Sequence, residues 1–291
     1  MSREKLTVTT INGKFVKRGE DKISVFDNSL LYAEGLFETV LAVDNELIFL
    51  KEHLARLYRG SKIMGLTIPI PKNTLINWMY KTIKAHPARI KKLRLTITSG
   101  ETARWVGRDG KSQVILSASP HEMPTKAFKV DVSEYRVDQK SEFRRIKTIS
   151  YAIHAVALNL AKKRKCDDAL MLNGKNQVAE ISSANIFWVR KNKIYTPPLS
   201  AGCLEGITRK ILIREAKKSG YQVLEKNCTL ATLYKADEVF MTSSLKLIIP
   251  ISIIKDRKST HKISQGDIAS HLHLRFAKIS GLPELRLYSA K

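Results

Sequence analysis

The most constraining feature of this chain is the order of three short segments in its second half. The first is Ile146-Lys147-Thr-Ile-Ser-Tyr151, which carries a lysine amine. About thirty residues later the second follows as Ala179-Glu180-Ile-Ser-Ser-Ala-Asn185-Ile-Phe. The third is Glu205-Gly206-Ile207-Thr208-Arg209, which comes directly before a helical pattern. The fold must therefore accommodate an amine, a carboxylate on a hairpin and a Gly-Ile-Thr turn that opens a helix.

Each of these segments suits one part of a single chemistry. A lysine amine can form a Schiff base with a carbonyl compound. A carboxylate can keep a pyridine nitrogen protonated, and the start of a helix can bind a phosphate group. Together the three segments predict a site for pyridoxal 5′-phosphate (PLP).

Length and composition fit a globular protein of one large or two smaller domains, because 291 residues can bury a full core. No apolar run approaches the roughly 18 to 20 residues of a membrane span, and the N-terminus lacks a secretory signal. We therefore expect a cytoplasmic protein with no membrane partner. The cysteines are scattered without a Cys-x-x-Cys pair, so we expect no disulfide framework and no metal site; they are Cys166, Cys203 and Cys228.

The charge is strongly basic, with 51 lysine and arginine residues against 27 acidic residues, and it bears on the choice of partner. The basic residues are spread along the whole chain and form no single tail, which favours solvated surfaces over a nucleic-acid site. Attraction of an anionic small-molecule substrate is the second interpretation. We expect no nucleic-acid partner, because the chain has no RNA-binding aromatic signature and no Cys/His finger.

The pattern along the chain predicts a mixed α+β protein in two parts. We expect a small N-terminal domain over 1–120, a linker over 121–127 with Pro124 inside it, and a large domain over 128–291. Thr208 is predicted as the N-cap of a helix and Gly220 as its C-cap. Helical periodicity is predicted over 51–64, 73–85, 150–165 and 208–219. Strands are predicted over 7–16 (a hairpin around Asn12-Gly13), 22–25, 37–43, 46–50, 92–98, 113–119, 169–172, 177–179, 185–190, 193–196, 239–242 and 248–254.

With these motifs the chain resembles the class IV aminotransferase superfamily, the fold-type IV PLP-dependent enzymes. This group includes branched-chain aminotransferases, D-amino-acid aminotransferases and aminodeoxychorismate lyases. The resemblance runs from about residue 10 to residue 256 and adds Tyr32-Ala-Glu-Gly-Leu-Phe-Glu38-Thr, His53-Leu-Ala-Arg56-Leu and Tyr195-Thr-Pro-Pro to the three segments above. It implies a D-amino-acid aminotransferase-like fold, with a small α/β N-terminal domain and a larger C-terminal domain that has a β-barrel-like core. It also implies a homodimer.

The resemblance assigns roles to individual residues. Lys147 would be the catalytic Schiff-base lysine and the proton shuttle, and Glu180 would pair with the pyridine nitrogen. Tyr151 would lie against the phenolic oxygen of the cofactor. The residues expected around the phosphate are Arg56, Ile207, Thr208, Ser243 and Ser244.

Substrate-facing residues are less sharply defined. Tyr32 and Glu38 lie in the motif that should face the substrate, although a core tyrosine and a surface glutamate are open alternatives. Arg94 and Arg104 are candidates for binding a substrate carboxylate. An ordinary structural role is an equally good interpretation of both arginines.

Several positions depart from the family pattern. Asn28 and Ser29 replace an Arg-Gly pair, and Ala33 replaces a glycine. Ser150 stands where asparagine is common, and Ile181 follows Glu180 where a small residue is usual. A side chain as bulky as Ile181 would narrow the cofactor face or press on the phosphate loop. These departures bear on the identity of the substrate more than on PLP binding.

The peripheral motifs favour a lyase over a transaminase. Thr242-Ser-Ser-Leu stands in place of the Gly-Thr-Ala-Ala of branched-chain transaminases, and no Arg-x-His trap follows the third small-domain strand. We therefore expect an aminodeoxychorismate lyase-like enzyme that converts 4-amino-4-deoxychorismate to 4-aminobenzoate and pyruvate. The alternative is an aminotransferase that moves an amino group between a D-, branched-chain or other amino acid and a 2-oxo acid.

Overall fold

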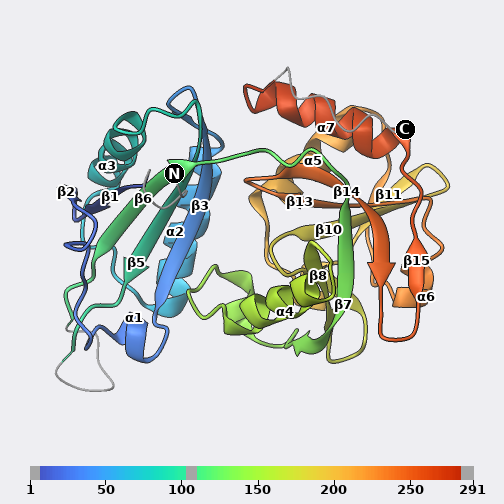
Figure 1. Cartoon of the computed structure of the whole chain (residues 1–291), viewed down its shortest axis with the longest axis horizontal. Helices are drawn as coiled ribbons and strands as arrows, with labels where there is room; N and C mark the ends of the chain where they lie inside the picture. The colour runs from blue at the N-terminus through green and yellow to red at the C-terminus, as the bar shows by residue number, and fades with distance from the viewer. Residues whose placement is uncertain (1–6, 103–109, 283–291) are drawn as a thin grey trace. The chain divides into compact units, whose positions relative to one another are not determined.

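The computed structural model describes residues 7–102 and 110–282 and divides into two compact units (Figure 1). The first unit consists of residues up to 122 together with Ile146–Ser150. The second consists of Met123–Arg145 and the chain from Tyr151 onward. The segment that carries Lys147 thus packs with the first unit, although it lies inside the range predicted for the large domain. The predicted boundary at residue 120 stays a prediction.

The first unit is built on a six-stranded antiparallel sheet with the order β2-β1-β6-β5-β3-β4. Three helices accompany it, namely α1 (Asn28–Leu31), α2 (Leu50–Met64) and α3 (Lys72–Lys84). The strands are β1 (Val8–Ile11), β2 (Lys14–Val16), β3 (Gly35–Val43), β4 (Glu46–Leu47), β5 (Ile90–Thr98) and β6 (Val114–Pro120).

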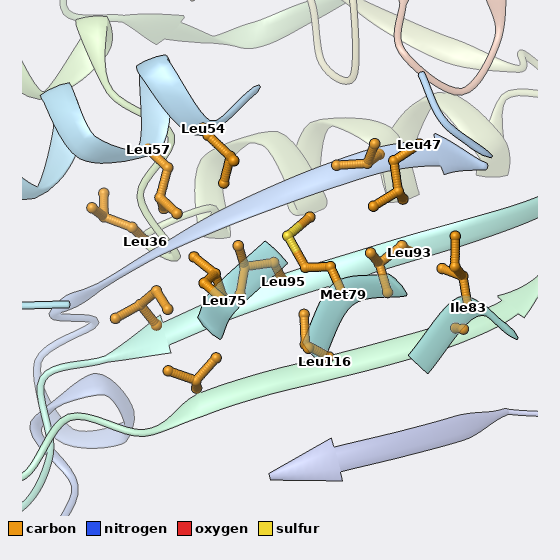
Figure 2. Packing of buried hydrophobic residues seen from close by; sticks show 14 of the residues in the cluster. Leu36, Leu47, Leu54, Leu57, Leu75, Met79, Ile83, Leu93, Leu95 and Leu116 are labelled. Atoms are coloured by element: carbon orange, nitrogen blue, oxygen red, sulfur yellow. The ribbon is translucent and has the colours of Figure 1, made fainter. Parts of the chain in front are cut away.

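The core of the first unit lies between the sheet and the helices α2 and α3 (Figure 2). Apolar side chains alternate along β5, so that every second residue faces the helices. Both helices contribute apolar side chains with helical spacing to the same cluster. The residues labelled in Figure 2 are Leu36, Leu47, Leu54, Leu57, Leu75, Met79, Ile83, Leu93, Leu95 and Leu116.

The second unit is built on a nine-stranded sheet with the order β12-β11-β10-β13-β14-β7-β8-β9, and β15 pairs with β14 at the side. The pairs β11–β12, β14–β7 and β7–β8 are parallel and the others are antiparallel. The strands are β7 (Phe128–Val137), β8 (Asp168–Asn173), β9 (Val178–Ile181), β10 (Asn185–Arg190), β11 (Lys193–Thr196), β12 (Val223–Glu225), β13 (Glu238–Ser243), β14 (Leu247–Lys255) and β15 (Thr260–Lys262).

Four α-helices and two short 3₁₀ turns complete the second unit among the described residues. The helices are α4 (Ala152–Lys163), α5 (Ile207–Lys218), α6 (Leu230–Leu233) and α7 (Asp267–Ile279), and the turns are Glu142–Arg145 and Leu199–Ala201. No helix in 7–102 or 110–282 has the length and apolar character that crossing a membrane requires.

Most predicted elements are present, and the exceptions have physical reasons. Residues 22–25 form no strand; Ile23 and Val25 are exposed there, and no strand of the described residues pairs with them. The ten-residue strand β7 was not predicted. Its first half, Phe128-Lys-Val-Asp-Val132, alternates apolar and polar residues as a half-buried strand does. The alternation breaks over 133–136, where the pairing with β8 also shifts register. Helix α5 begins at Ile207 with Gly206 as N-cap, so the prediction of Thr208 as N-cap is wrong.

A buried ion cluster stands out beneath α2 in the first unit. Glu38 lies on β3 with 1% of its surface exposed, and both of its carboxylate oxygens accept hydrogen bonds from Arg56. The two N–O distances are 2.8 Å to Nε and 2.6 Å to Nη2 of Arg56, and His53 Nδ1 lies 2.7 Å from the second oxygen. Burial alone raises the pKa of Glu38, but Arg56 and His53 outweigh it and lower the pKa to about 2.

We predict that this cluster makes the first unit acid-sensitive. Because Glu38 has a lower pKa in the folded protein than its ordinary value of 4.5, it stabilises the fold above pH 4.5. That contribution is lost as the pH falls toward 2, because the unfolded chain then binds the extra proton. Glu38→Gln would lower the free energy of unfolding near neutral pH by about 3–5 kcal/mol, since it leaves Arg56 buried without its counter-charge. Urea unfolding of both proteins over this pH range measures the effect.

The matched control is an exposed ion pair of the same unit. Asp44 lies 3.2 Å from Arg89, and both side chains are more than half exposed. Asp44→Asn should change the free energy of unfolding by less than about 1 kcal/mol at any of these pH values. An equal loss in both variants would contradict the assignment of the acid sensitivity to Glu38.

Candidate functional site

Lys147 is held by the first unit through a strand-like segment. Its backbone carbonyl accepts a hydrogen bond from the Phe37 N–H at 2.9 Å, and Ile149 N–H donates to the Gly35 carbonyl at 3.0 Å. Glycine is needed at position 35, because a Cβ atom there would lie 2.8 Å from the Ile97 backbone carbonyl and equally close to the end of the Ile149 side chain. Residues 146–150 therefore run along the edge of β3 and fix the backbone of Lys147.

The aromatic ring of Phe37 brings two predicted site residues together. The Lys147 Nζ atom lies 4.3 Å from the centre of this ring, and the Arg94 guanidinium carbon lies 4.0 Å from it. The negative face of an aromatic ring attracts cations at such distances. The first unit thus positions an amine and a guanidinium around one ring, as a site for an anionic substrate would require.

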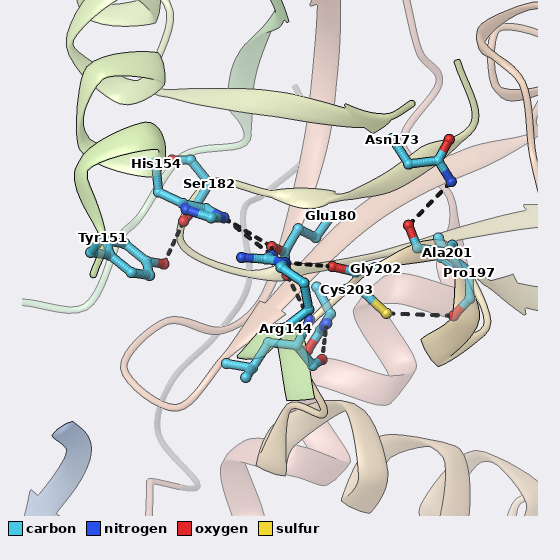
Figure 3. Close-up of polar contacts among 12 residues, drawn as sticks. Arg144, Tyr151, His154, Asn173, Glu180, Ser182, Pro197, Ala201, Gly202 and Cys203 are labelled. Atoms are coloured by element: carbon cyan, nitrogen blue, oxygen red, sulfur yellow. Dashed lines mark hydrogen bonds and ion pairs between the residues drawn. The ribbon is translucent and has the colours of Figure 1, made fainter. Parts of the chain in front are cut away.

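Glu180 is the centre of the polar cluster in the second unit (Figure 3). It lies on β9, is 4% exposed, and pairs across the sheet with Met171 on the face that α4 covers. Its Oε1 atom accepts a hydrogen bond from Arg144 Nη2 and lies 3.0 Å from His154 Nε2. Its Oε2 atom accepts the Leu204 backbone N–H at 2.9 Å.

The charge of Glu180 follows from these partners. Burial raises the pKa of the carboxyl group, but Arg144, His154 and the Leu204 N–H together lower it below its ordinary value. Arg144 is itself held in place, because its Nε atom donates to the Gly202 carbonyl at 2.9 Å. Glu180 is therefore an ionised carboxylate at neutral pH, in surroundings that exclude water.

Tyr151 belongs to the same cluster. It precedes the first turn of α4, and its hydroxyl donates to the Ser182 carbonyl at 2.6 Å. Its ring stacks on that of His154 with 4.6 Å between the ring centres. This spacing of three residues is the one that places two side chains on the same side of a helix turn.

The start of α5 has the features of an anion site. Its N-cap residue is Gly206, which has no side chain that could accept a hydrogen bond. The first backbone N–H groups of the helix therefore lack a capping side chain. The Thr208 hydroxyl is buried in the first turn, and it has no hydrogen-bond partner among the described residues. The hydroxyl of Thr242, at the end of β13, is likewise buried without a hydrogen-bond partner among the described residues. Ile207 lies in the same turn and is buried.

Asn185 joins this helix start to Glu180. Its side-chain amide donates to the Leu204 carbonyl at 2.8 Å. The backbone N–H of Leu204 in turn donates to Glu180. A Cβ atom on Gly206 would collide with the Asn185 side chain. Glycine is thus needed at 206 for space, since its φ of −71° is open to any residue.

The turn between β13 and β14 carries Ser243 and Ser244 and is fixed by a second network. Lys246 Nζ donates to Ser183 Oγ at 2.7 Å and lies 3.4 Å from the buried carboxylate of Asp168. Ser183 Oγ lies 2.5 Å from the same carboxylate, and Ser182 also bonds it. The turn at 243–247 is therefore tied to the turn that follows Glu180.

The remaining predicted residues have different surroundings. Arg56 and Glu38 bond each other inside the first unit, so Glu38 orients Arg56, and a direct contact between Glu38 and a substrate stays a prediction. Tyr32 caps the end of α1 and is half exposed. Arg104 lies outside the described residues. In the described ranges, no group of three or more His, Cys, Asp or Glu side chains could hold a metal ion.

The structure corrects the expectation for Ile181. This side chain is fully buried in the core of the second unit, next to Leu170 and Ile186. Successive side chains of a strand face opposite sides, so Ile181 points away from the side on which Glu180 lies. It belongs to the core and not to the Glu180 side of β9.

Sequence reasoning missed Arg144 and His154. Arg144 lies three residues before Lys147 and was indistinguishable from the many other basic residues of the chain. His154 lies three residues after Tyr151, and that spacing was the available signal.

The start of α5, which no side chain caps, is the feature of the second unit that suits an anionic group. The family model described as amino-transferase class IV matches residues 35–254. The chain therefore belongs to the class IV aminotransferase family, and the mixed two-sheet architecture is that of fold-type IV.

Three relatives illustrate the similarity. A protein of Methanocaldococcus jannaschii named "Putative branched-chain-amino-acid aminotransferase" is 34% identical over 289 residues, which cover 96% of this chain and 98% of the relative. The aminodeoxychorismate lyase of Bacillus subtilis is 26% identical and covers 92% and 93%. The branched-chain aminotransferase of the thermophilic archaeon Thermoproteus uzoniensis, solved with norvaline, has a TM-score of 0.86 at 29% identity and covers 95% and 96%.

We predict that the helix start depends on the contact between Gly206 and Asn185. Gly206→Ala would lower the free energy of unfolding by about 1–3 kcal/mol, because the added methyl group forces Asn185 to move. In an Asn185→Ala background the same substitution should cost at least about 1 kcal/mol less, since the clash is gone. Chemical unfolding of the four proteins of this double-mutant cycle measures the coupling.

Gly174→Ala is the matched control. A Cβ atom there would meet only the flexible end of Gln139 at 3.4 Å. That substitution should be nearly neutral in both backgrounds. Equal costs for Gly206→Ala with and without Asn185 would show that the side chain does not fill the space.

Proposed function

We propose that this protein is a PLP-dependent aminotransferase that moves an amino group between an aliphatic or branched-chain amino acid and a 2-oxo acid. The observation that carries the proposal is the 34% identity to the M. jannaschii protein over 96% of this chain. The likeness to the T. uzoniensis aminotransferase supports the same reaction. This proposal favours the alternative of the sequence analysis over its first expectation, the lyase.

The residues present fit PLP. Lys147 would bond it, and the ionised Glu180 would accept a hydrogen bond from its pyridine N–H. The helix start at Ile207 and Thr208 would hold its phosphate, and the buried Thr208 hydroxyl is an orphaned donor that suits a phosphate oxygen. Tyr151 is proposed against its phenolic oxygen, and the other proposed phosphate ligands are Arg56, Ser243 and Ser244.

The chemistry supplied by PLP is the withdrawal of electrons from the substrate carbon into its ring. Glu180 keeps the ring nitrogen protonated, because a buried carboxylate that stays ionised favours a proton on its neighbour. The Lys147 amine would take the proton from the substrate carbon and hold it for return later in the reaction. Arg94, beside the same phenylalanine as Lys147, is proposed to bind a substrate carboxylate.

A lyase reaction is the second candidate. The turn Thr242-Ser-Ser-Leu245 resembles that of aminodeoxychorismate lyases, and the B. subtilis lyase is among the relatives. Both reactions begin with proton removal by Lys147, so the residues described above serve either one. The two reactions are distinguished by their products, because a lyase releases pyruvate and an aminotransferase forms a new amino acid and a 2-oxo acid.

We expect the purified protein with PLP to transfer the amino group of a branched-chain amino acid to 2-oxoglutarate, which yields glutamate and a new 2-oxo acid. Lys147→Ala should lower the rate on the order of 10³-fold or more and abolish the covalent, borohydride-sensitive cofactor bond. Mass spectrometry of the products, with both enantiomers of each donor, gives the result.

Lys175→Ala, in an exposed turn of the second unit, is the control and should retain full activity. Release of pyruvate from aminodeoxychorismate, without amino transfer from any amino acid, would identify the lyase and reject the aminotransferase. A wild-type protein that binds no PLP would reject both.

We further propose that two copies of the chain associate through the segment 25–32. This segment exposes five large apolar side chains, each between 49% and 63% accessible, and such a patch is typical of an interface. They are Val25, Phe26, Leu30, Leu31 and Tyr32.

Leu30→Lys is expected to convert a dimer of twice 32.9 kDa into a monomer, because a charge inside a buried apolar contact is costly. Light scattering during size-exclusion chromatography measures the mass. Leu274→Lys, at an exposed leucine of α7 outside the segment 25–32, should leave the dimer intact. A monomeric wild-type protein, or a dimer that Leu30→Lys does not disturb, would refute this interface.

A further inference from the structure

His154 is a buried histidine that contacts three members of the site at once. It lies in the first turn of α4 with 4% of its surface exposed. Its Nε2 atom is 3.0 Å from Glu180 Oε1 and 3.3 Å from Arg144 Nη2 (Figure 3). Its ring face stacks on Tyr151 at an angle of 22° between the two planes. A histidine that only filled space would not need polar partners on one nitrogen and an aromatic partner on its face.

The two polar neighbours make opposite demands on the same nitrogen. Arg144 can only donate a hydrogen bond, whereas an ionised Glu180 can only accept one. Arg144 already donates to Glu180 Oε1. A hydrogen on His154 Nε2 makes the shorter contact, to Glu180, a hydrogen bond, and Arg144 keeps its own bond to the same carboxylate. The surroundings therefore select the form of the ring in which Nε2 carries a proton.

In this arrangement the Glu180 carboxylate receives three donors from three different places in the chain. Arg144 and His154 share Oε1, and the Leu204 N–H occupies Oε2. An ionised carboxylate has about four acceptor positions, so one more donor can be accepted. His154 thus fixes the direction of the remaining position and, through its stacking, the side chain of Tyr151.

We propose that His154 is a positioning residue that acts through Glu180: its Nε2–H holds the carboxylate ionised and oriented toward the ring nitrogen of the cofactor. This inference rests on the proposed function for the identity of the cofactor. The effect on Glu180 itself, however, belongs to the protein alone. A donor removed from an ionised carboxylate weakens the charged form, so the pKa of Glu180 rises when the Nε2–H is lost.

Two substitutions separate hydrogen bonding from packing. His154→Phe keeps an aromatic ring against Tyr151 but removes the donor. His154→Gln loses the ring but places an amide N–H near the former Nε2 position. The matched control is His273→Phe, because His273 is an equally buried helical histidine that bonds the Ile248 carbonyl at 3.0 Å in another part of the second unit.

The first measurement is the titration of the Glu180 carboxyl carbon by NMR in the cofactor-free protein. The second is the ¹⁵N shift of the cofactor ring nitrogen in the loaded protein, together with kcat and KM. We expect His154→Phe to raise the titration midpoint of Glu180 and to shift the ring nitrogen toward its unprotonated value. We also expect it to lower kcat about tenfold, with little change in KM for the amino donor. His154→Gln should return the Glu180 midpoint, the ring-nitrogen shift and kcat most of the way to their wild-type values. His273→Phe should match wild type in all three.

The outcomes distinguish this inference from the proposed function. An unchanged Glu180 titration in His154→Phe overturns the role of His154, whether or not the cofactor binds. A wild-type protein that binds no PLP overturns the proposed function and, with it, the cofactor part of this inference, while the titration result stands by itself. If His154→Phe fails to fold, the same comparison is made with His154→Gln and His154→Ala. Equal midpoints in those two variants then overturn the role of the donor.

Discussion

The second unit depends on one buried negative charge that is fully compensated. A carboxylate taken out of water costs several kcal/mol unless charged and hydrogen-bonding partners replace the solvent. Glu180 obtains them from the turn before Lys147, from the first turn of α4 and from the loop before α5. The charge therefore joins three segments that are distant in sequence. Each of these three segments is held in place because it stabilises the same carboxylate.

The first unit also buries a carboxylate and compensates its charge with its own residues. Glu38 is buried under α2 and compensated by a bidentate arginine and a histidine, so it resembles Glu180 in its partners but serves a different element. In both cases an arginine supplies the main charge, because a guanidinium keeps its charge when buried and matches a carboxylate in shape. Each unit thus contains a buried carboxylate that an arginine and a histidine compensate together.

The local motifs could be predicted from the sequence because their information is local. Lys147, Glu180 and the Gly206-Ile207-Thr208 turn each lie in a short segment whose residue types indicate a role. Helices such as α2 and α5 were predicted because their apolar residues recur with a helical period. The family model confirms the family to which these motifs pointed.

What could not be predicted depends on contacts between distant residues. His154 and Arg144 meet Glu180 only after β9 and α4 pack together, and nothing in the sequence distinguishes Arg144 from the other basic residues. The side of the strand on which Ile181 lies follows from its pairing with Leu170, which is a tertiary contact. The alternation of strand β7 breaks after Val132, where its pairing with β8 shifts register, and that shift is set by the sheet.

The segment 146–150 has a consequence for how the chain is divided. The chain leaves the first unit after residue 122, returns for five residues to run along β3, and leaves again after Ser150. The first unit is therefore discontinuous in sequence, and a fragment that ended near residue 120 would lack the piece that covers the edge of β3. The complementary fragment would carry Lys147 without Phe37 and Gly35, the residues that fix it. The two units are thus not separable modules, because neither one can be inherited, recombined or expressed by a single cut without losing the surroundings of the lysine.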